Sequence, residues 1–599
     1  MAIESFYPRP RPSLDLNFAA GNFDPRITFS RASAATYYDG RTTAKAEENL
    51  LVRSQEFDNA SWGKLRTDVL NVYTAPDGTL TAKESRPDEA LDRHFAYQWY
   101  VTGKAGKSYT ASVYVRANGY NYFAIGFEDN THGAKKSYIF DLLGSSATLL
   151  YSAGDSIFSN ASATITSVGG GWFRCTMTAT CVNDLASYLT LQLGPSPTAT
   201  PTISHGMPYF AGDGASGIYL WGAQLEQRSQ VTAYTPTTTQ PITNYIPVLQ
   251  TALSGVPRID HDPVTGECKG LLIEEYRTNL LTYSDQFDNA AWSKGSATVS
   301  ANSVVAPDGS LGADMVSASA SYGGVYTSFA GSAVSYTYSV FAKKGTSDSL
   351  YVKANNAGQI AYYAFNLSAG TFAASSGAGS ATMAPVGNGW YRVSVTPANV
   401  ASGTSYFEIL SSTTGTFYLW GAQVETGAFP TSYIPTTSAQ VTRAADSASM
   451  TGANFSSWYR QDEGTLCAEV NVPFSASYTT RLFAVDDGTS NNVLQGQYNS
   501  SAQMTFALDV GGANKFALNK SGNTFGTPHK FIGSYKSGDA AFGVDGSGVS
   551  LSNSSWAGFV PTTLRIGMAF GGGQQPNGHI KRIAYYAESL PEYLQALTS

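Results

Sequence analysis

The 599-residue chain is poor in charge and has no long apolar run. Only 14% of its residues are charged, against about 25% in typical soluble proteins, so Gly, Ser, Thr, Asn and Ala must build much of its surface. A formal net charge of -7 argues against a nucleic-acid or acidic-membrane partner. No run of about 18 apolar residues occurs, so no membrane insertion is expected. The first residues also lack the apolar core of a secretion signal.

Cysteine and recognisable catalytic motifs are scarce as well. Four cysteines in a chain of this length exclude a disulfide framework, and we expect free, mostly buried thiols. The sequence has no Gly-x-Ser-x-Gly elbow, phosphate loop, Cys-x-x-Cys pair or His-Glu-x-x-His helix. We therefore expect that the protein is not an enzyme. Paired carboxylates for glycan cleavage are assembled in space, so the sequence alone leaves that alternative open.

Metal-ligand patterns are weak. Residues 260–262 read Asp-His-Asp, but strand alternation would place both carboxylates on one face and the imidazole on the other. We interpret this stretch as a polar strand end, and no metal site is predicted. Two acidic turns, at residues 128–130 and 486–488, have oxygens that Ca²⁺ could use. No other cofactor is expected.

What the sequence does contain is β-structure. Short runs of alternating apolar and polar residues are separated by clusters of Gly, Asn, Asp and Ser, which is typical of sandwiches. We predict an all-β fold of tandem antiparallel β-sandwiches. The single convincing helical pattern is short and C-terminal, over residues 591–597.

A repeat of domain size is the strongest signal. The stretch from Asn49 to Trp62 returns, slightly changed, from Asn279 to Trp292. A whole module has therefore been duplicated. The first copy is longer, and much of its excess falls near residues 194–217, a Pro/Thr/Gly-rich stretch predicted to be a loop insertion. Duplicated modules without a catalytic motif favour binding strengthened by multiplicity.

The repeat divides the chain into five regions. An N-terminal segment occupies residues 1–40 and the first module 41–246. A β segment at 247–278 continues the N-terminal region. The second module spans 279–445, and a third, unrelated β domain spans 455–599.

The module pattern, with its Asn-Leu-Leu and Phe-Asp-Asn-Ala-x-Trp stretches, resembles the jelly-roll carbohydrate-binding modules appended to xylanases and related glycanases. The larger arrangement is similar to bacteriophage tail-fibre and head-spike fibre proteins, through residues 29–37, 257–260, 271–274 and 420–425. In that family the first of these stretches runs almost directly into the second. Here the first module intervenes, so we interpret it as an insertion into a surface hairpin. Residues 455–599 resemble concanavalin A-like and laminin-G-like lectin domains.

Aromatic and cationic side chains share the non-core side of several predicted strands, because alternate residues of a strand point to opposite faces. An aromatic ring can stack on the apolar face of a sugar, and an Arg fork can hold its hydroxyl or carboxylate groups. The carbohydrate-binding candidates are Tyr114, Arg116, Tyr122, Trp172, Arg174, Phe341, Lys343, Tyr351, Trp390 and Arg392. The alternative is that they pack at a sandwich edge or between subunits. The tryptophans predicted to lie in the core are Trp62, Trp221, Trp292 and Trp420.

The sequence therefore predicts a non-enzymatic virion fibre or spike subunit that binds bacterial surface polysaccharide. The resemblance implies display on the particle surface after assembly in the host cytoplasm, contacts with other virion proteins through the N-terminal segment, and a homo-oligomer, a trimer. Two alternatives stay open. A structural spacer or decoration protein would bury its outward aromatics between subunits. A capsule depolymerase would release oligosaccharides and lose activity when one carboxylate is changed.

Overall fold

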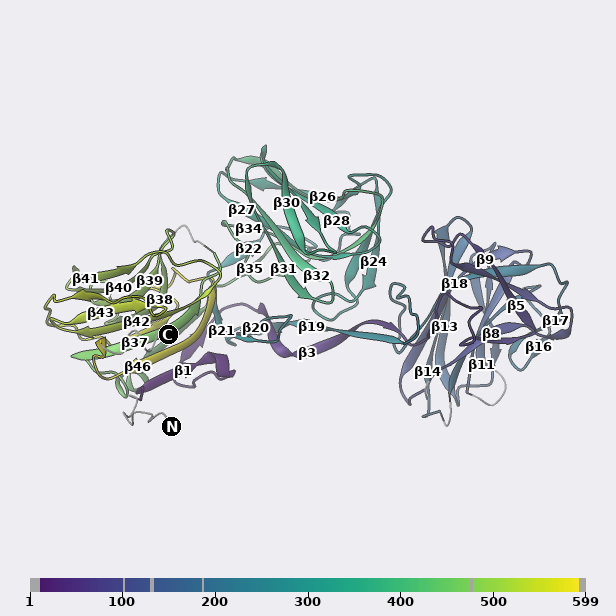
Figure 1. The fold of residues 1–599 in the computed structure, drawn as a ribbon, viewed down its shortest axis with the longest axis horizontal. Coiled ribbons are helices and arrows are strands. Elements are labelled where there is room, and N and C mark those ends of the chain that lie inside the picture. The colour runs from purple at the N-terminus through teal and green to yellow at the C-terminus, as the bar shows by residue number, and fades with distance from the viewer. Residues whose placement is uncertain (1–10, 101–102, 130–133, 186–187, 475–477, 592–599) are drawn as a thin grey trace, which may run out of the picture. The chain divides into compact units, whose positions relative to one another are not determined.

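A computed structural model describes residues 11–100, 103–129, 134–185, 188–474 and 478–591 (Figure 1). Almost every described element is a strand, which confirms the all-β prediction. In these described ranges the helical elements are a turn, η1 (Phe18–Ala20), and a short helix, α1 (Ala453–Ser456). The predicted helix at 591–597 lies, beyond its first residue, outside the described part. Over the described residues, no helix has the length and apolarity to cross a membrane.

The chain divides into two compact units, one of which spans Lys45–Tyr245. The other consists of Met1–Ala44 and Ile246–Ser599. Strand β3 (Ala35–Asn49) leads into the first unit, β19 (Ile242–Ala252) leads out of it, and these two strands pair with each other. The first module is therefore inserted between two neighbouring strands.

The inserted unit is a sandwich of two six-stranded sheets. One has the order β12 (Ser146–Ser152), β11 (Ala134–Asp141), β10 (Tyr122–Glu128), β15 (Leu189–Ser196), β8 (Phe95–Tyr100) and β4 (Gly63–Leu65). The other has the order β13 (Phe158–Gly169), β14 (Trp172–Cys181), β9 (Ser108–Asn118), β18 (Gly217–Glu226), β6 (Ala82–Pro87) and β5 (Thr67–Tyr73). A small sheet of β16 (Ile203–Ser204), β17 (Met207–Ala211) and β7 (Leu91–Arg93) is added. Alternate residues such as Val113 and Ile125 fill the core.

The second module has the same architecture. One sheet has the order β23 (Ser293–Gly295), β26 (Gly324–Gly331), β33 (Gly403–Ser411), β28 (Ser349–Asn356), β29 (Gln359–Asn366) and β30 (Thr371–Gly377). The other has the order β24 (Ala297–Val304), β25 (Ala313–Ala318), β34 (Gly415–Thr426), β27 (Tyr336–Lys344), β32 (Trp390–Pro397) and β31 (Gly379–Gly387). A separate pair, β22 (Arg277–Asn279) and β35 (Val441–Arg443), brings the ends of the module together.

The C-terminal sandwich also has two sheets. The first has the order β20 (Ile259–His261), β21 (Cys268–Ile273), β46 (Gly578–Tyr586), β37 (Glu463–Asn471), β42 (Pro528–Lys536), β43 (Ala540–Val544) and β44 (Ser550–Ser552), and β1 (Leu14–Asn17) also pairs with β46. The second has the order β2 (Thr28–Ser30), β36 (Ser447–Thr451), β45 (Thr563–Ile566), β38 (Thr480–Asp486), β39 (Val493–Tyr498), β40 (Met504–Val510) and β41 (Ala513–Lys520).

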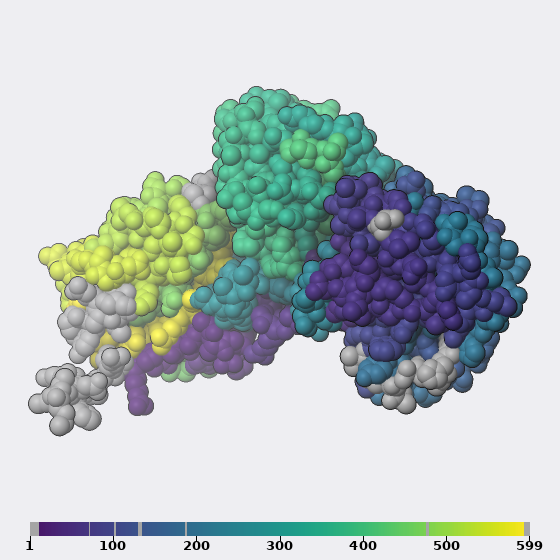
Figure 2. Space-filling model, turned by 45° about the vertical axis from the view of Figure 1, so that its right-hand side comes forward, coloured from purple at the N-terminus to yellow at the C-terminus, as the bar shows by residue number. Residues whose placement is uncertain are grey.

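This sandwich is assembled from three distant parts of the chain, which corrects the predicted division. Strand β1 pairs with β46 and β2 with β36, so residues 14–30 are not a separate segment. Leu14, Leu16 and Phe18 lie in the same core as the C-terminal strands. Figure 2 shows the purple N-terminal residues lying against the yellow C-terminal ones. Residues 455–599 alone would therefore leave part of this core uncovered.

The four cysteines are free, as predicted. Cys175 and Cys181 are buried, and Cys268 and Cys467 are partly buried. Burial raises the pKa of the Cys181 thiol to about 11, so this thiol is protonated and unreactive at neutral pH.

Candidate functional site

The repeated Asn-Leu-Leu motif anchors the end of each module to its beginning. The side-chain amide of Asn49 donates to the carbonyls of Ala223 and Thr235, each at 2.9 Å. Asn279 makes the equivalent two bonds in the second module. Both side chains are fully buried, where an unpaired amide would be costly. The motif thus holds the C-terminal tail of each module against the rest of it. This tail includes Thr235 in the first module and Ile434 in the second.

In each module this tail covers the non-core face of one sheet. The hydroxyls of Ser54 and Tyr234 lie 2.6 Å apart, and those of Ser284 and Tyr433 lie at the same distance. The tyrosine ring then packs on a tryptophan, with ring centres 4.8 Å apart in both modules. These tryptophans are Trp221 and Trp420, which are buried as predicted, as are Trp62 and Trp292.

The tail changes the interpretation of three predicted binding residues. Trp172, Phe341 and Trp390 do lie on the non-core side of their strands, but they are only 4%, 2% and 1% exposed. The expectation that they form an open platform is wrong. Strand alternation says which face a side chain takes, but not that another segment of the same module lies on that face.

The cationic candidates mostly belong to the same covered layer. Arg174 lies over the ring of Tyr114 at 5.3 Å, and Arg392 lies over the ring of Phe341 at 5.4 Å. Arg116 is exposed, and Lys343 is partly buried at the end of β27. These residues therefore form no single surface.

An open surface is present on the other sheet of the second module. Tyr326, Glu408, Lys353 and Tyr362 occupy directly paired positions on the adjacent strands β26, β33, β28 and β29. They form a row across the sheet, because paired residues project to the same face. In the middle of the row the Lys353 ammonium lies 2.7 Å from the Glu408 carboxylate.

Tyr351 and Tyr322 lie beside this row and continue its aromatic surface. The Tyr351 ring centre is 5.0 Å from that of Tyr362, and 5.6 Å from that of Tyr322 with only 16° between the planes. Tyr322 is 58% exposed and Tyr326 is 38% exposed. We call the six residues the tyrosine face: Tyr322, Tyr326, Tyr351, Lys353, Tyr362 and Glu408.

The Tyr362 phenol of this face is a neutral hydrogen-bonding group. Desolvation raises the pKa of Tyr362, and the nearby Tyr322, Tyr351 and Glu408 raise it further. Of the ten predicted residues, only Tyr351 lies on the tyrosine face. The other five residues of the tyrosine face were not predicted, because the alternation within one strand does not reveal its register with the next strand.

The matching surface of the first module is covered. The equivalent paired positions of the first module are occupied by Tyr97, Gln192, Gly126 and Ser137. The Ser137 hydroxyl donates to the Gly206 carbonyl at 2.6 Å, within the insertion predicted near 194–217. Met207 of the insertion packs on Phe95 and Ala124. Tyr122, on the same sheet, is partly buried.

The acidic turns considered for Ca²⁺ are occupied by protein donors. Glu128 accepts a bond from Gln192 at 2.7 Å, and Asp486 pairs with Arg565 at 2.6 Å. Asp487 closes its own turn, and residue 130 lies outside the described part. In the described ranges, no group of three or more His, Cys, Asp or Glu side chains is arranged to hold a metal. Calcium binding stays a prediction.

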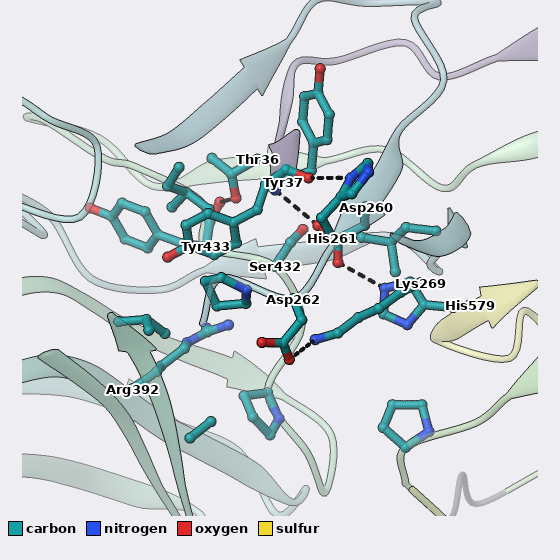
Figure 3. Close-up of a pocket in the computed structure, with 18 of the residues that line it drawn as sticks. Thr36, Tyr37, Asp260, His261, Asp262, Lys269, Arg392, Ser432, Tyr433 and His579 are labelled. Atoms are coloured by element: carbon teal, nitrogen blue, oxygen red, sulfur yellow. Dashed lines mark hydrogen bonds and ion pairs between the residues drawn. The ribbon is translucent and has the colours of Figure 1, made fainter. Parts of the chain in front are cut away.

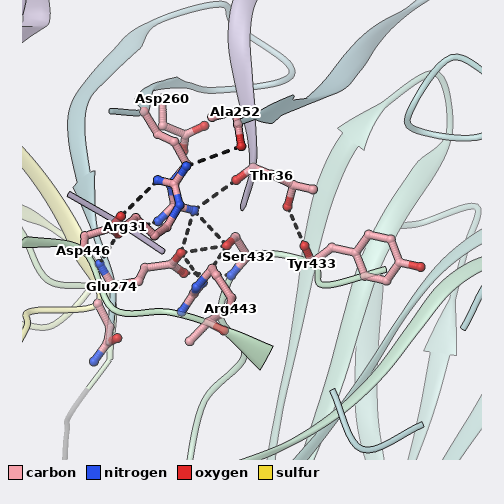
Figure 4. A network of polar contacts seen from close by, with 12 residues as sticks. Arg31, Thr36, Ala252, Asp260, Glu274, Ser432, Tyr433, Arg443 and Asp446 are labelled. Carbon is pink, nitrogen blue, oxygen red and sulfur yellow. Dashed lines mark hydrogen bonds and ion pairs between the residues drawn. The ribbon is translucent and has the colours of Figure 1, made fainter. Parts of the chain in front are cut away.

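A buried charge network holds the larger unit together. Arg258 pairs with Asp446 at 2.6 Å and with Glu274 at 2.8 Å, while Arg443 also contacts Glu274 and Arg31 reaches Asp446 at 3.1 Å. Figure 4 shows this network, in which Ser432 contacts Glu274 and Arg443. Burial opposes ionisation of Glu274, but the two arginines outweigh it and lower its pKa. The stretches at 29–37, 257–260 and 271–274 therefore have a structural role, because they contribute Arg31, Arg258 and Glu274 to this network.

No family model and no curated protein matches the chain. Among solved structures, it is similar to the CBM40 module of a Ruminococcus gnavus IT-sialidase bound to alpha2,3 sialyllactose, with 14% identity over 24% of this chain and 88% of that chain and a TM-score of 0.22. The tandem CBM22 modules of Paenibacillus barcinonensis Xyn10C match with 10% identity, 64% and 98% coverage and a TM-score of 0.19. Domains LG4-5 of the mouse laminin alpha1 chain match with 10% identity, 44% and 88% coverage and a TM-score of 0.18. These likenesses concern the β-sandwich fold alone.

Proposed function

We propose that the protein is a non-enzymatic saccharide-binding protein and that the tyrosine face is its binding surface. One observation carries the proposal: Tyr351 stacks on Tyr322 and packs at a tilt against Tyr362, so the three rings lie side by side on an accessible face beside an ion pair. Aromatic rings offer the flat apolar surface on which a sugar ring stacks, and their hydroxyls provide hydrogen bonds. The Lys353 and Glu408 charges add stronger donors and acceptors for sugar hydroxyls.

The proposal includes the setting that the sequence resemblance supports. The chain would be a fibre or spike subunit of a phage-like virion and would bind bacterial surface polysaccharide. One shallow site with a millimolar dissociation constant contributes only about 4 kcal/mol. A homo-oligomer, a trimer, would raise avidity by roughly 10²–10⁴-fold without new contacts.

Attachment to other virion proteins through the N-terminal segment has a structural consequence. Within residues 14–30, β1 and β2 are strands of the C-terminal sandwich. The C-terminal sandwich would therefore lie near the particle.

The test compares the full chain with its Tyr351→Ala variant on a glycan array and on whole bacteria. We expect saturable binding that falls at least about tenfold in the variant, because loss of a stacked ring removes about 1.4 kcal/mol or more. Tyr122→Ala in the first module is the matched control and should bind as the parent does. The same samples should release no oligosaccharide.

Equal binding by the parent and by Tyr351→Ala would contradict the tyrosine face as the site. A folded parent that binds no glycan and no cell would favour the spacer alternative. Release of oligosaccharides would favour the depolymerase.

A further inference from the structure

A cavity of about 520 Å³ lies within the larger unit, away from the tyrosine face (Figure 3). Its walls come from separate parts of the chain, including Tyr38 of β3, Asp260 of β20, Arg392 of β32 and His579 of β46. The volume lies in the range of small-ligand sites, about 300–1,000 Å³. Proline and valine side chains supply much of the remaining wall.

The carboxylates that line this cavity are already paired with basic side chains of the protein. The pairs are Asp260 with His579 at 2.8 Å, Asp262 with Lys269 at 3.1 Å, and Glu274 with Arg258 at 2.8 Å. Figure 3 shows the first two pairs, with Arg392 reaching toward the same space from its strand. A positively charged ligand would therefore find no free carboxylate among the described lining residues.

Arg392 is the cation of this wall that lacks an ion pair. Its guanidinium donates to the Thr431 carbonyl at 2.6 Å and to the Ser339 hydroxyl at 3.1 Å, and its buried Nε has no partner among the described residues. No carboxylate of the described residues lies within ion-pair distance of it. Desolvation lowers its pKa, as expected for a buried cation that contacts no carboxylate.

Tyr38 provides a second unsatisfied group. It is 9% exposed, and its hydroxyl has no hydrogen-bond partner in the described part of the chain. Tyr38 and Arg392 both line this cavity. A buried hydroxyl and a buried guanidinium nitrogen that both lack partners are costly unless a ligand satisfies them.

We propose that this cavity binds a carboxylate-bearing sugar unit of the uronic-acid class. The guanidinium of Arg392 would pair with the carboxylate, which matches its planar fork. The Tyr38 hydroxyl would bond to the carboxylate or a ring hydroxyl, and the apolar wall would contact the ring C–H groups. The assignment rests on the proposed saccharide-binding function and refines it toward acidic polysaccharide.

The first module supplies the matched control. Arg174 occupies the position of Arg392, as the register of its strand shows. Its guanidinium donates to the Ser112 hydroxyl at 2.9 and 3.2 Å. The cavity is lined by residues of the larger unit, and Arg174 is not among them.

The experiment measures calorimetric binding of methyl glucuronoside, its neutral methyl ester and acetate to the full chain. We expect the glucuronoside to bind, the ester to bind at least about tenfold more weakly, and acetate not to bind. Arg392→Gln should abolish binding, and Arg174→Gln should leave it unchanged. Tyr38→Phe removes only an unpartnered hydroxyl, so it should weaken binding several-fold while the melting temperature holds.

Three results would overturn the cavity proposal: no glucuronoside binding by the parent, equal affinity for the ester, or unchanged affinity in both Arg392→Gln and Tyr38→Phe. The polysaccharide assay with Tyr351→Ala separates this outcome from failure of the proposed function. Loss of polysaccharide binding in Tyr351→Ala, with no glucuronoside binding by the parent, overturns the cavity alone. Glucuronoside binding, with unchanged polysaccharide binding by Tyr351→Ala, overturns the tyrosine face alone.

Discussion

The two copies of the module share one strand order but treat the outer face of one sheet in opposite ways. Where the second module has Tyr351, Lys353 and Tyr362, the first has Ala124, Gly126 and Ser137 at matched register. Small side chains allow the insertion with Met207 to pack flat on the sheet. Large polar and aromatic side chains keep the same surface open. Duplication thus produced one open face and one closed face from the same scaffold.

The opposite sheet shows no such difference. In both modules a C-terminal tail is held by a buried Asn, and a tyrosine from the tail covers a tryptophan. These buried contacts contribute to the stability of each module. On this sheet the copies are therefore expected to differ only where the larger unit adds the cavity beside Arg392.

The largest expected effect tests the covered layer. Trp390→Ala and its counterpart Trp172→Ala should each lower the free energy of unfolding by about 3–5 kcal/mol, because each empties a buried site. Thermal unfolding and binding per folded molecule are measured together. Loss of binding by Trp390→Ala at an unchanged melting temperature would show that the covered face is the binding surface.

A smaller effect concerns a charge that differs between the copies. Lys83 of the first module pairs with Asp58 at 2.8 Å, whereas Asp314 stands at the matched position of the second module. Asp314 is 1% exposed, and desolvation raises its pKa to about 6, with a further contribution from Asp288. Because this pKa is higher in the folded state than in the unfolded state, the free energy of unfolding falls as the pH rises from about 4 to about 6.

In Asp314→Asn this pH dependence should disappear. The difference in unfolding free energy between variant and parent should shift in favour of the variant by about 2 kcal/mol between pH 4 and pH 7, on top of a constant loss of about 1 kcal/mol for a hydrogen bond. Lys83→Gln, which removes no carboxylate, should show no such step. A difference that stays flat with pH would mean that Asp314 titrates normally.

The smallest stability effect is expected on the open face. Lys353→Gln should change the free energy of unfolding by less than about 1 kcal/mol, as expected for an accessible ion pair, yet weaken saccharide binding several-fold. Lys104→Gln, which breaks an exposed pair with Asp184 in the first module, is the control. It should change the free energy of unfolding by no more than Lys353→Gln does, and it should leave saccharide binding unchanged. If both variants bind equally well, the ion pair takes no part in recognition and only the rings remain.

The sequence alone determined what depends on local pattern. Alternation with a period of two predicts strands and their two faces, which is why the β-class and the buried Trp62, Trp221, Trp292 and Trp420 could be predicted. The repeat located the duplicated modules, because similar stretches must occupy similar places in similar folds. Tyr351 was predicted as outward-facing for the same local reason.

Tertiary structure decided what covers each face. The tail over Phe341, the insertion over Ala124 and the strands from residues 14–30 in the C-terminal sandwich all join segments far apart in the chain. The tyrosine face needs the register of four strands, and the cavity needs Tyr38, Arg392 and His579 brought together. Periodicity carries no information about such pairings, because they are set by the burial and hydrogen bonding of the whole chain.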